Sequence, residues 1–228
     1  MLSDRVRRAV QSAAIAGSFV FIFAIVALAD DRRQNTAGEF DFYVLSLSWS
    51  PSYCESAKER KGRPDPQCNG RPFAFIVHGL WPQYAQGFPS YCPVRAEKLH
   101  RATVGGALDL MPSPRLVFHE WERHGTCSGL SPHAYFEAVR KARAVVKIPA
   151  GYLSPAEPLS VAPDEVAAAF EKANPGLPAG AIAVACDATR LTEVRICMGK
   201  DFSFDDCADV VAHACKHDKI AMPAVHGE

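Results

Sequence analysis

The sequence LVFHEWERHGTC, at residues 116–127, gathers ionisable side chains into one short segment. These side chains are His119, Glu120, Arg123 and His124. Residues four positions apart share one face of an α-helix, so a helix would bring Glu120 beside His124. The same spacing would bring His119 beside Arg123. The segment therefore predicts a helix that presents acid–base groups together with a cation able to bind an anion.

A second segment, FIVHGLWP at residues 75–82, places another histidine behind an apolar run. Residues 73–77 are apolar without alternation, which predicts a buried central strand. His78 is expected at the end of this strand, because Gly79 interrupts the pattern, and residues 82–93 are expected to form a loop. The question is whether the fold brings the two segments together.

Apolar runs, prolines and glycines predict the other elements of the chain. Strands are expected at residues 42–49, 181–185 and 191–196. Helices are expected at residues 115–128, from Ser131 and Pro132 onward, and at residues 164–173. Residues 54–68 and 149–163 are expected to form loops.

The composition suits a single globular domain. The chain has 228 residues, of which 48% are hydrophobic and 22% are charged. Lys and Arg together number 25, as do Asp and Glu, so the overall charge argues against a protein that coats nucleic acids indiscriminately. A polyanion would have to be bound by local groups.

Residues 1–29 have the pattern of a signal peptide. Arginines within residues 5–8 precede an apolar run at residues 13–28, and Ala27-Leu28-Ala29 fits a cleavage site. We therefore expect export to the periplasm or the medium, with residues 30–228 as the mature domain and no stable membrane association after cleavage. An uncleaved membrane anchor is the alternative, because the apolar run is almost long enough to span a bilayer.

All eight cysteines follow this leader. An even number of cysteines in an exported chain predicts four disulfides, although spacing alone leaves their pairing open. Structural zinc is the alternative, but even the closest pair, Cys207 and Cys215, lacks the short spacing typical of zinc ligands.

The histidine spacing also bears on catalytic zinc. The zinc-protease motif needs histidines four residues apart, whereas His119 and His124 are five apart. A zinc site made by His78, His119 and His124 stays an alternative. Two histidines from separate segments, with a glutamate and a cation, better suit metal-free acid–base cleavage of a phosphodiester. The remaining histidines are assigned structural roles by default: His100, His133, His213, His217 and His226.

The segments HGLWP, residues 78–82, and HEWERHGTC, residues 119–127, resemble the two active-site signatures of the ribonuclease T2 family. A looser resemblance extends from about Asp41 to Cys215 and includes LTEVRIC at residues 191–197. It implies an α+β fold, with a twisted, mainly antiparallel sheet flanked by helices and held by disulfides. It also implies an endoribonuclease that needs no metal or cofactor and does not cleave DNA, which lacks the 2′-hydroxyl nucleophile.

By this resemblance, single-stranded RNA is cleaved to 2′,3′-cyclic phosphates and then to 3′-phosphates. The catalytic residues implied are His78, Glu120 and His124, and the substrate-binding residues implied are Trp81, His119 and Arg123. His124 is the general base and His78 the general acid. Arg123 stands where the family usually has lysine, and both cations suit a phosphate. Gln83 replaces an acidic residue that helps some members select a base, so low base specificity is expected.

The resemblance further implies the disulfides Cys92–Cys127, Cys186–Cys215 and Cys197–Cys207, which leaves Cys54–Cys68. We expect a monomer with RNA as its partner. The main alternative from another functional class is an RNA-binding or inhibitory protein that keeps the cleft without turnover. The presence of both proton-transfer histidines argues against it, because a binding module needs neither.

Overall fold

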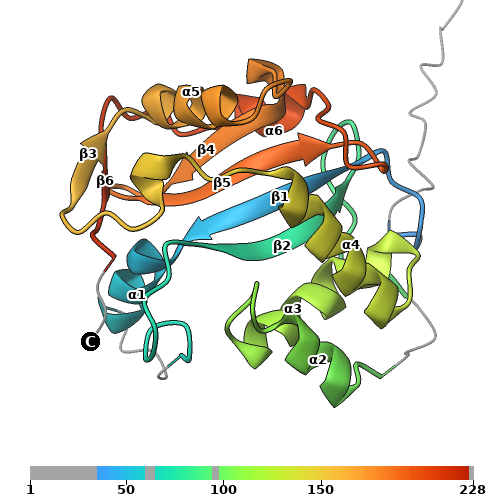
Figure 1. Cartoon of the computed structure of the whole chain (residues 1–228). Coiled ribbons are helices and arrows are strands. Elements are labelled where there is room, and N and C mark those ends of the chain that lie inside the picture. Colours follow the sequence, from blue (N-terminus) through green and yellow to red (C-terminus); the bar gives the residue numbers. More distant parts are fainter. Residues whose placement is uncertain (1–34, 60–64, 94–97, 226–228) are drawn as a thin grey trace, which may run out of the picture. The chain divides into compact units, whose positions relative to one another are not determined.

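A computed structural model describes residues 35–59, 65–93 and 98–225, so the expected signal peptide lies outside the described residues. The main sheet has four antiparallel strands in the order β2-β1-β5-β4 (Figure 1). These strands are β1 (Phe42–Trp49), β2 (Phe75–Gln83), β4 (Ile182–Cys186) and β5 (Leu191–Met198). A second, two-stranded sheet pairs β3 (Leu159–Val161) with β6 (Ile220–Met222).

Helices flank the main sheet. In Figure 1, α5 and α6 lie along β4, whereas α2, α3 and α4 gather beside β2. The helices are α1 (Ser50–Glu59), α2 (Arg101–Ala107), α3 (Pro114–Arg123), α4 (Pro132–Val145), α5 (Pro163–Ala173) and α6 (Ala208–Ala212). The predicted α+β fold class is therefore confirmed. Within the described ranges, no helix is long and apolar enough to cross a membrane.

The main sheet has one apolar face and one polar face. Along β1, Leu45 and Leu47 are fully buried and pair with apolar residues of β5, whereas Ser46 and Ser48 point to the other side. Ser46 pairs with Arg195, and Ser48 pairs with Glu193. The polar face therefore carries small hydroxyl side chains in its middle and charged side chains on the neighbouring strand.

A β-bulge in β2 sets the position of His78. The register pairs Ser46 with Gly79 but Leu47 with Val77, so His78 is the extra residue of β2. In a regular strand, residues three apart point to opposite faces, which would separate His78 from Trp81. The bulge places both side chains on the polar face, where they line one cavity.

The prediction for this strand was wrong in two respects. The strand does not end at His78 but continues to Gln83, and it is an edge strand rather than a central one. The edge position explains how Pro82 fits within it, because a proline without an N–H is tolerated where no further strand has to be paired.

The segment 116–127 also differs from its prediction. The α-helix ends at Arg123, and His124 is its C-terminal cap. Residues Gly125–Ser128 then form one turn of 3₁₀-helix, followed by Gly129 in a left-handed conformation with φ 74°. A side chain at Gly125 would collide with the rings of Trp121 and Tyr135, so only glycine fits after His124.

The two segments predicted to be loops also contain regular structure. Helix α1 occupies the start of residues 54–68, because Pro51 opens a helix instead of only ending the strand before it. Strand β3 lies within residues 149–163. The predicted helix start at Ser131 is confirmed, since its side chain accepts a hydrogen bond from Ala134 N at 3.3 Å.

Four disulfides hold these elements together, and their pairs are those implied by the resemblance. They are Cys54–Cys68, Cys92–Cys127, Cys186–Cys215 and Cys197–Cys207. Cys92–Cys127 joins the segment after β2 to the turn after α3. Beside it, Tyr91 N donates a hydrogen bond to Arg123 O at 2.9 Å. The end of segment 116–127 is therefore covalently linked to the segment that follows β2.

Candidate active site

A cavity of about 570 Å³ opens between the polar face of the sheet and the C-terminal end of α3. All six site residues predicted from the sequence line it: His78, Trp81, His119, Glu120, Arg123 and His124. The bulged strand β2 contributes His78 and Trp81. Helix α3 and its C-terminal cap contribute the other four. The fold thus brings together two segments that are about forty residues apart in the chain.

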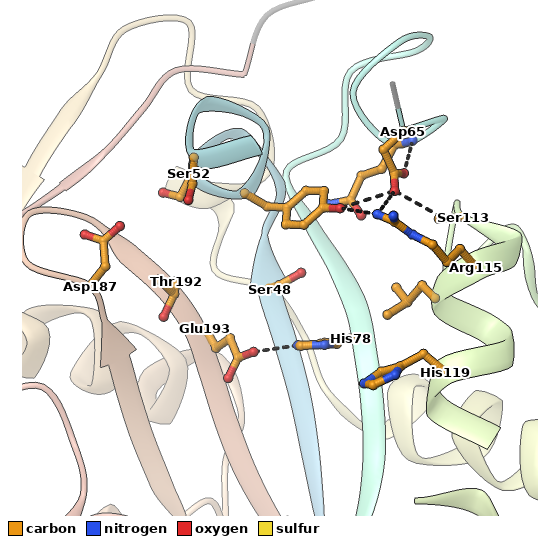
Figure 2. A pocket seen from close by; sticks show the side chains of 14 residues that line it. Ser48, Ser52, Asp65, His78, Ser113, Arg115, His119, Asp187, Thr192 and Glu193 are labelled. Atoms are coloured by element: carbon orange, nitrogen blue, oxygen red, sulfur yellow. Dashed lines mark hydrogen bonds and ion pairs between the residues drawn. The ribbon is translucent and has the colours of Figure 1, made fainter. Parts of the chain in front are cut away.

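A second cavity, of about 490 Å³, lies on the other side of His78 (Figure 2). His78, His119 and Glu193 line both cavities and so mark their boundary. Inside the second cavity, Asp65 accepts hydrogen bonds from Ser113 Oγ at 3.2 Å and from Arg115 Nη2 at 3.4 Å. An extended ligand bound across His78 would therefore occupy a cavity on each side of this residue.

Glu120 lines the first cavity and is almost completely buried. Its Oε2 accepts a hydrogen bond from Trp81 Nε1 at 2.8 Å, and its Oε1 lies 3.5 Å from His78 Nε2. Burial raises the pKa of Glu120 to about 7, although the charge of His78 and the hydrogen bond from Trp81 act in the opposite direction. Glu120 is therefore protonated in mildly acidic solution.

Gly79 makes this contact possible. A Cβ atom at position 79 would collide with Oε2 of Glu120 and with the indole nitrogen of Trp81. The glycine that follows His78 therefore leaves the space in which Trp81 meets Glu120.

The environment of His78 favours its charged form. Its Nδ1 lies 2.5 Å from Oε1 of Glu193. Burial disfavours the charged imidazole, but the hydrogen bond and charge of Glu193, together with the charge of Glu120, outweigh burial and raise the pKa of His78. This imidazole is therefore suited to donate a proton.

Glu193 and Arg195, both on β5, were not predicted as site residues. Oε2 of Glu193 accepts two hydrogen bonds from Arg195, from Nε at 2.9 Å and from Nη2 at 2.8 Å. Burial disfavours the carboxylate, but His78 and Arg195 outweigh burial and lower the pKa of Glu193 to about 2. The sequence signal that could have indicated them is two charged residues two positions apart in a mainly apolar strand, a spacing that places both on one face.

The environment of His124 favours its neutral form. The residue is 6% exposed, and its ring is stacked on Trp81, with ring centroids 5.2 Å apart. Burial lowers the pKa of His124 to about 3, and the positive charges of Arg123 and His78 act in the same direction. Its buried Nδ1 has no hydrogen-bond partner among the described residues. This imidazole is therefore suited to accept a proton.

His119 and Arg123 add positive charge to the cavity. The His119 side chain is about half exposed, at 46%, and burial together with the charge of Arg123 lowers its pKa. The buried Nε of Arg123 has no hydrogen-bond partner among the described residues, so its guanidinium retains a free donor. His213, assigned a structural role from the sequence, also lines this cavity, as does the exposed ring of Phe88.

The chain is similar in sequence to proteins described as ribonucleases. The chain is 46% identical to a ribonuclease of Aeromonas hydrophila over 106 residues, which are 46% of each protein. It is 32% identical to a probable ribonuclease of Haemophilus influenzae over 160 residues, 65% of this chain and 59% of that protein. The chain thus aligns with only about half of the length of these curated relatives.

Solved structures share the fold. Trichomaglin, described as an S-like ribonuclease, matches with a TM-score of 0.64 and 24% identity, over 83% of this chain and all of the other. RNase NT, solved in complex with 5′-AMP, matches with a TM-score of 0.62 and 24% identity, over 82% of this chain and 99% of the other. The sequence pattern of the Ribonuclease T2 family matches residues 40–207, which include both histidine segments. The chain therefore belongs to the ribonuclease T2 family.

Proposed function

We propose that the chain is an exported, metal-independent endoribonuclease of low base specificity that cleaves single-stranded RNA. The observation that carries this proposal is the opposite protonation preference of two histidines in one cavity. The pKa of His78 is raised, and the pKa of His124 is lowered to about 3. Below neutral pH, one imidazole can thus give a proton while the other takes one. Family membership supports the same reaction class.

In the first step, neutral His124 removes the proton from the ribose 2′-hydroxyl. The 2′-oxygen attacks phosphorus, the bond from phosphorus to the 5′-oxygen breaks, and His78 gives its proton to that departing oxygen. The products are a 2′,3′-cyclic phosphate and a free 5′-hydroxyl. DNA is excluded because it has no 2′-hydroxyl.

The phosphorane carries additional negative charge on its non-bridging oxygens. Arg123 lines the cavity, and a guanidinium suits the geometry of phosphate oxygens. Protonated Glu120 supplies a second, uncharged donor, because burial raises its pKa to about 7. His119 lines both cavities, which supports a role in binding a phosphate of the RNA chain.

In the second step, the two histidines exchange roles. His78, left neutral, takes a proton from water, and the resulting hydroxide attacks phosphorus. The bond from phosphorus to the 2′-oxygen breaks, and His124, charged since the first step, gives its proton to that departing oxygen. The product is a 3′-phosphate, and both histidines regain their starting protonation states.

The walls of the first cavity support the proposal of low base specificity. The ring of Trp81 offers a surface on which any base can stack, and Phe88 adds a second exposed ring. The Gln83 amide is buried and donates to Pro82 O at 2.9 Å, so one of its two N–H donors is already used. Neither ring favours one base by hydrogen bonding.

We further propose that residues 1–29 direct export and are removed, and that the mature domain, residues 30–228, acts as a monomer. No stable membrane association is expected after cleavage. A periplasmic or extracellular location would also suit the four disulfides, which persist under oxidising conditions.

The test is to incubate the purified mature protein with an RNA and with the DNA of matching sequence, each with and without a strong chelator. We expect RNA fragments with cyclic-phosphate ends that convert slowly to 3′-phosphates, intact DNA, and no effect of the chelator. Cleavage lost on chelation would instead support a zinc hydrolase. RNA binding without cleavage would support the binding module.

A further inference from the structure

We infer that Glu193 and Arg195 form a positioning pair for His78, which fixes the imidazole nitrogen that protonates the leaving oxygen. The inference rests on the proposed function and extends it to two residues outside both active-site segments. Neither residue needs to touch the RNA for this role, because both act through His78.

The sheet places the pair at the right distance. Strand β1 lies between β2 and β5, so His78 and Glu193 are on strands separated by about 10 Å, twice the spacing of neighbouring strands. Their side chains meet above β1, as Figure 2 shows. The residue of β1 paired with Glu193 is Ser48, and a small side chain at that position leaves room for the contact.

The contact determines the orientation of the imidazole. Because Nδ1 of His78 donates to Oε1 of Glu193, Nε2 is the nitrogen that points toward the catalytic cavity, 3.5 Å from Oε1 of Glu120. A proton can therefore leave His78 only from Nε2 while the Glu193 contact holds. Without it, the ring could rotate or take the other tautomer.

The two carboxyl groups beside His78 differ in charge. Burial raises the pKa of Glu120 to about 7, so Glu120 is neutral in mildly acidic solution. The pKa of Glu193 is lowered to about 2, so Glu193 keeps its negative charge there. Glu193 is therefore the partner that stabilises charged His78 at the pH at which the general acid has to carry its proton.

Arg195 holds Glu193 in place. Its two donors bind Oε2 of Glu193, which leaves Oε1 for His78. Its guanidinium also lies over the ring of Trp81, with Cζ 5.5 Å from the ring centroid. The Arg195 charge itself disfavours charged His78, but its effect is smaller than that of Glu193.

Other charged and titratable groups face His78 from the opposite side. Helix α3 contributes His119 and Glu120, and its cap contributes His124. The charge of His78 lowers the pKa of both histidines, and Glu120 favours a charged His78 only once it is itself ionised. The short hydrogen bond from His78 to Glu193 is therefore the contact to remove in a test.

The experiment compares Glu193→Gln with the wild-type protein on two substrates. One is a dinucleoside phosphate, whose alkoxide leaving group needs a proton. The other is a nucleoside 3′-(4-nitrophenyl phosphate), whose phenolate leaves without one. A general-acid defect should reduce kcat/KM on the dinucleoside by about 10- to 100-fold, part of the ~100- to 10,000-fold supplied by a proton-transfer group. On the aryl ester, kcat/KM should fall by no more than about threefold, a change too small for the loss of a proton-transfer group.

Matched variants define the pattern. His78→Ala should show the same dependence on the leaving group with a larger loss, and Arg195→Gln should show it with a smaller one. Asp109→Asn is the control, because it removes an ion pair with Arg140 that lies between α2 and α4, outside both cavities. Its kcat/KM on both substrates should equal that of the wild-type protein. Thermal unfolding of each variant identifies any loss of fold.

A second measurement uses the wild-type protein, so it does not depend on the folding of a variant. Nitrogen-15 NMR of the histidine rings should show His78 with its proton on Nδ1 when neutral, and titrating above the ordinary histidine pKa of about 6.5. His78 titrating below that value, or protonated on Nε2 when neutral, would overturn the inference.

The substrate pair separates failure of the inference from failure of the proposed function. Equal losses on both substrates in Glu193→Gln, or no loss on either, would overturn the positioning role alone. Wild-type protein that cleaves neither the dinucleoside nor the aryl ester would overturn the proposed function itself.

Discussion

The two ends of the cavity contain the same type of side chain in opposite surroundings. On the sheet, His78 lies between two carboxyl groups, Glu193 and Glu120. At the end of α3, His124 lies against Trp81 and beside Arg123. The first environment raises the pKa of its histidine, and the second lowers the pKa to about 3. The neighbours of each ring therefore assign the acid and the base, although both residues are histidine.

The comparison also shows how two kinds of secondary structure prepare a site. The sheet face holds Glu193 close to His78 through its contact with Arg195, and so it stabilises the charged form of His78. The end of the helix buries the ring of His124 beside Arg123, and so it disfavours the charged form of His124. Four changes test this contrast.

The largest effect is expected from removal of the neutral histidine. His124→Ala should lower kcat on RNA by about 100-fold or more, the usual scale for a lost acid–base group. His133→Ala is the matched control, because His133 is an exposed histidine of α4 that does not line the catalytic cavity. Initial rates of RNA cleavage by both variants provide the measurement. Near-normal activity of His124→Ala would remove that residue from its proposed role.

The pH dependence tests both ends together. The base is available once His124 is neutral, so activity should rise as the pH passes about 3. The acid is lost as His78 deprotonates above its ordinary value, and Glu120 loses its proton at about 7. The value of kcat/KM should therefore be highest between these limits and should fall by about tenfold per pH unit well above neutrality. A maximum near pH 8 would contradict the assignment.

A smaller effect is expected from the cation beside His124. Arg123→Gln should slow cleavage by about tenfold, the scale of one charge-assisted contact. It should also shift the acid limit of the pH profile upward, because the charge of Arg123 helps to lower the pKa of His124. Arg123→Lys keeps the charge, so its acid limit should stay near that of the wild type. Equal shifts in the two variants would mean that the charge has no such effect.

The smallest effect is expected from the contact that joins the two ends. Trp81→Phe keeps a ring against His124 but removes the hydrogen bond to Glu120. The rate should fall by about fivefold, the scale of one ordinary hydrogen bond. Trp81→Ala also removes the ring, so its rate should fall further. Steady-state rates on a dinucleoside phosphate give both values, and equal losses would show that the ring contributes nothing.

Much of the catalytic cavity could be predicted from the sequence, because its first groups are close together in the chain. Glu120 and His124 lie on one helix and its cap, and His78 belongs to a compact segment with Trp81. Local spacing carries that information. The helix boundary was missed, although Gly125, directly after the cap His124, is the kind of residue that ends a helix.

The remaining features depend on how strands pair. Glu193 is 115 residues from His78 in the chain, and the contact requires the strand order β2-β1-β5. The local pattern of LTEVRIC does not predict which strand this segment will pair with. The edge position of β2 was missed for the same reason, since an apolar run is compatible with either a central strand or an edge strand protected on its faces.

The β-bulge at His78 also constrains how the chain can vary in length. Deletion of one residue between Ile76 and Gly79 would restore a regular strand and turn either the histidine or Trp81 to the opposite face of the sheet. Elsewhere, an insertion in a surface loop changes little. We therefore expect a library of single-residue deletions to show a sharp minimum of activity at these four positions, and relatives that keep activity to differ in length only outside them.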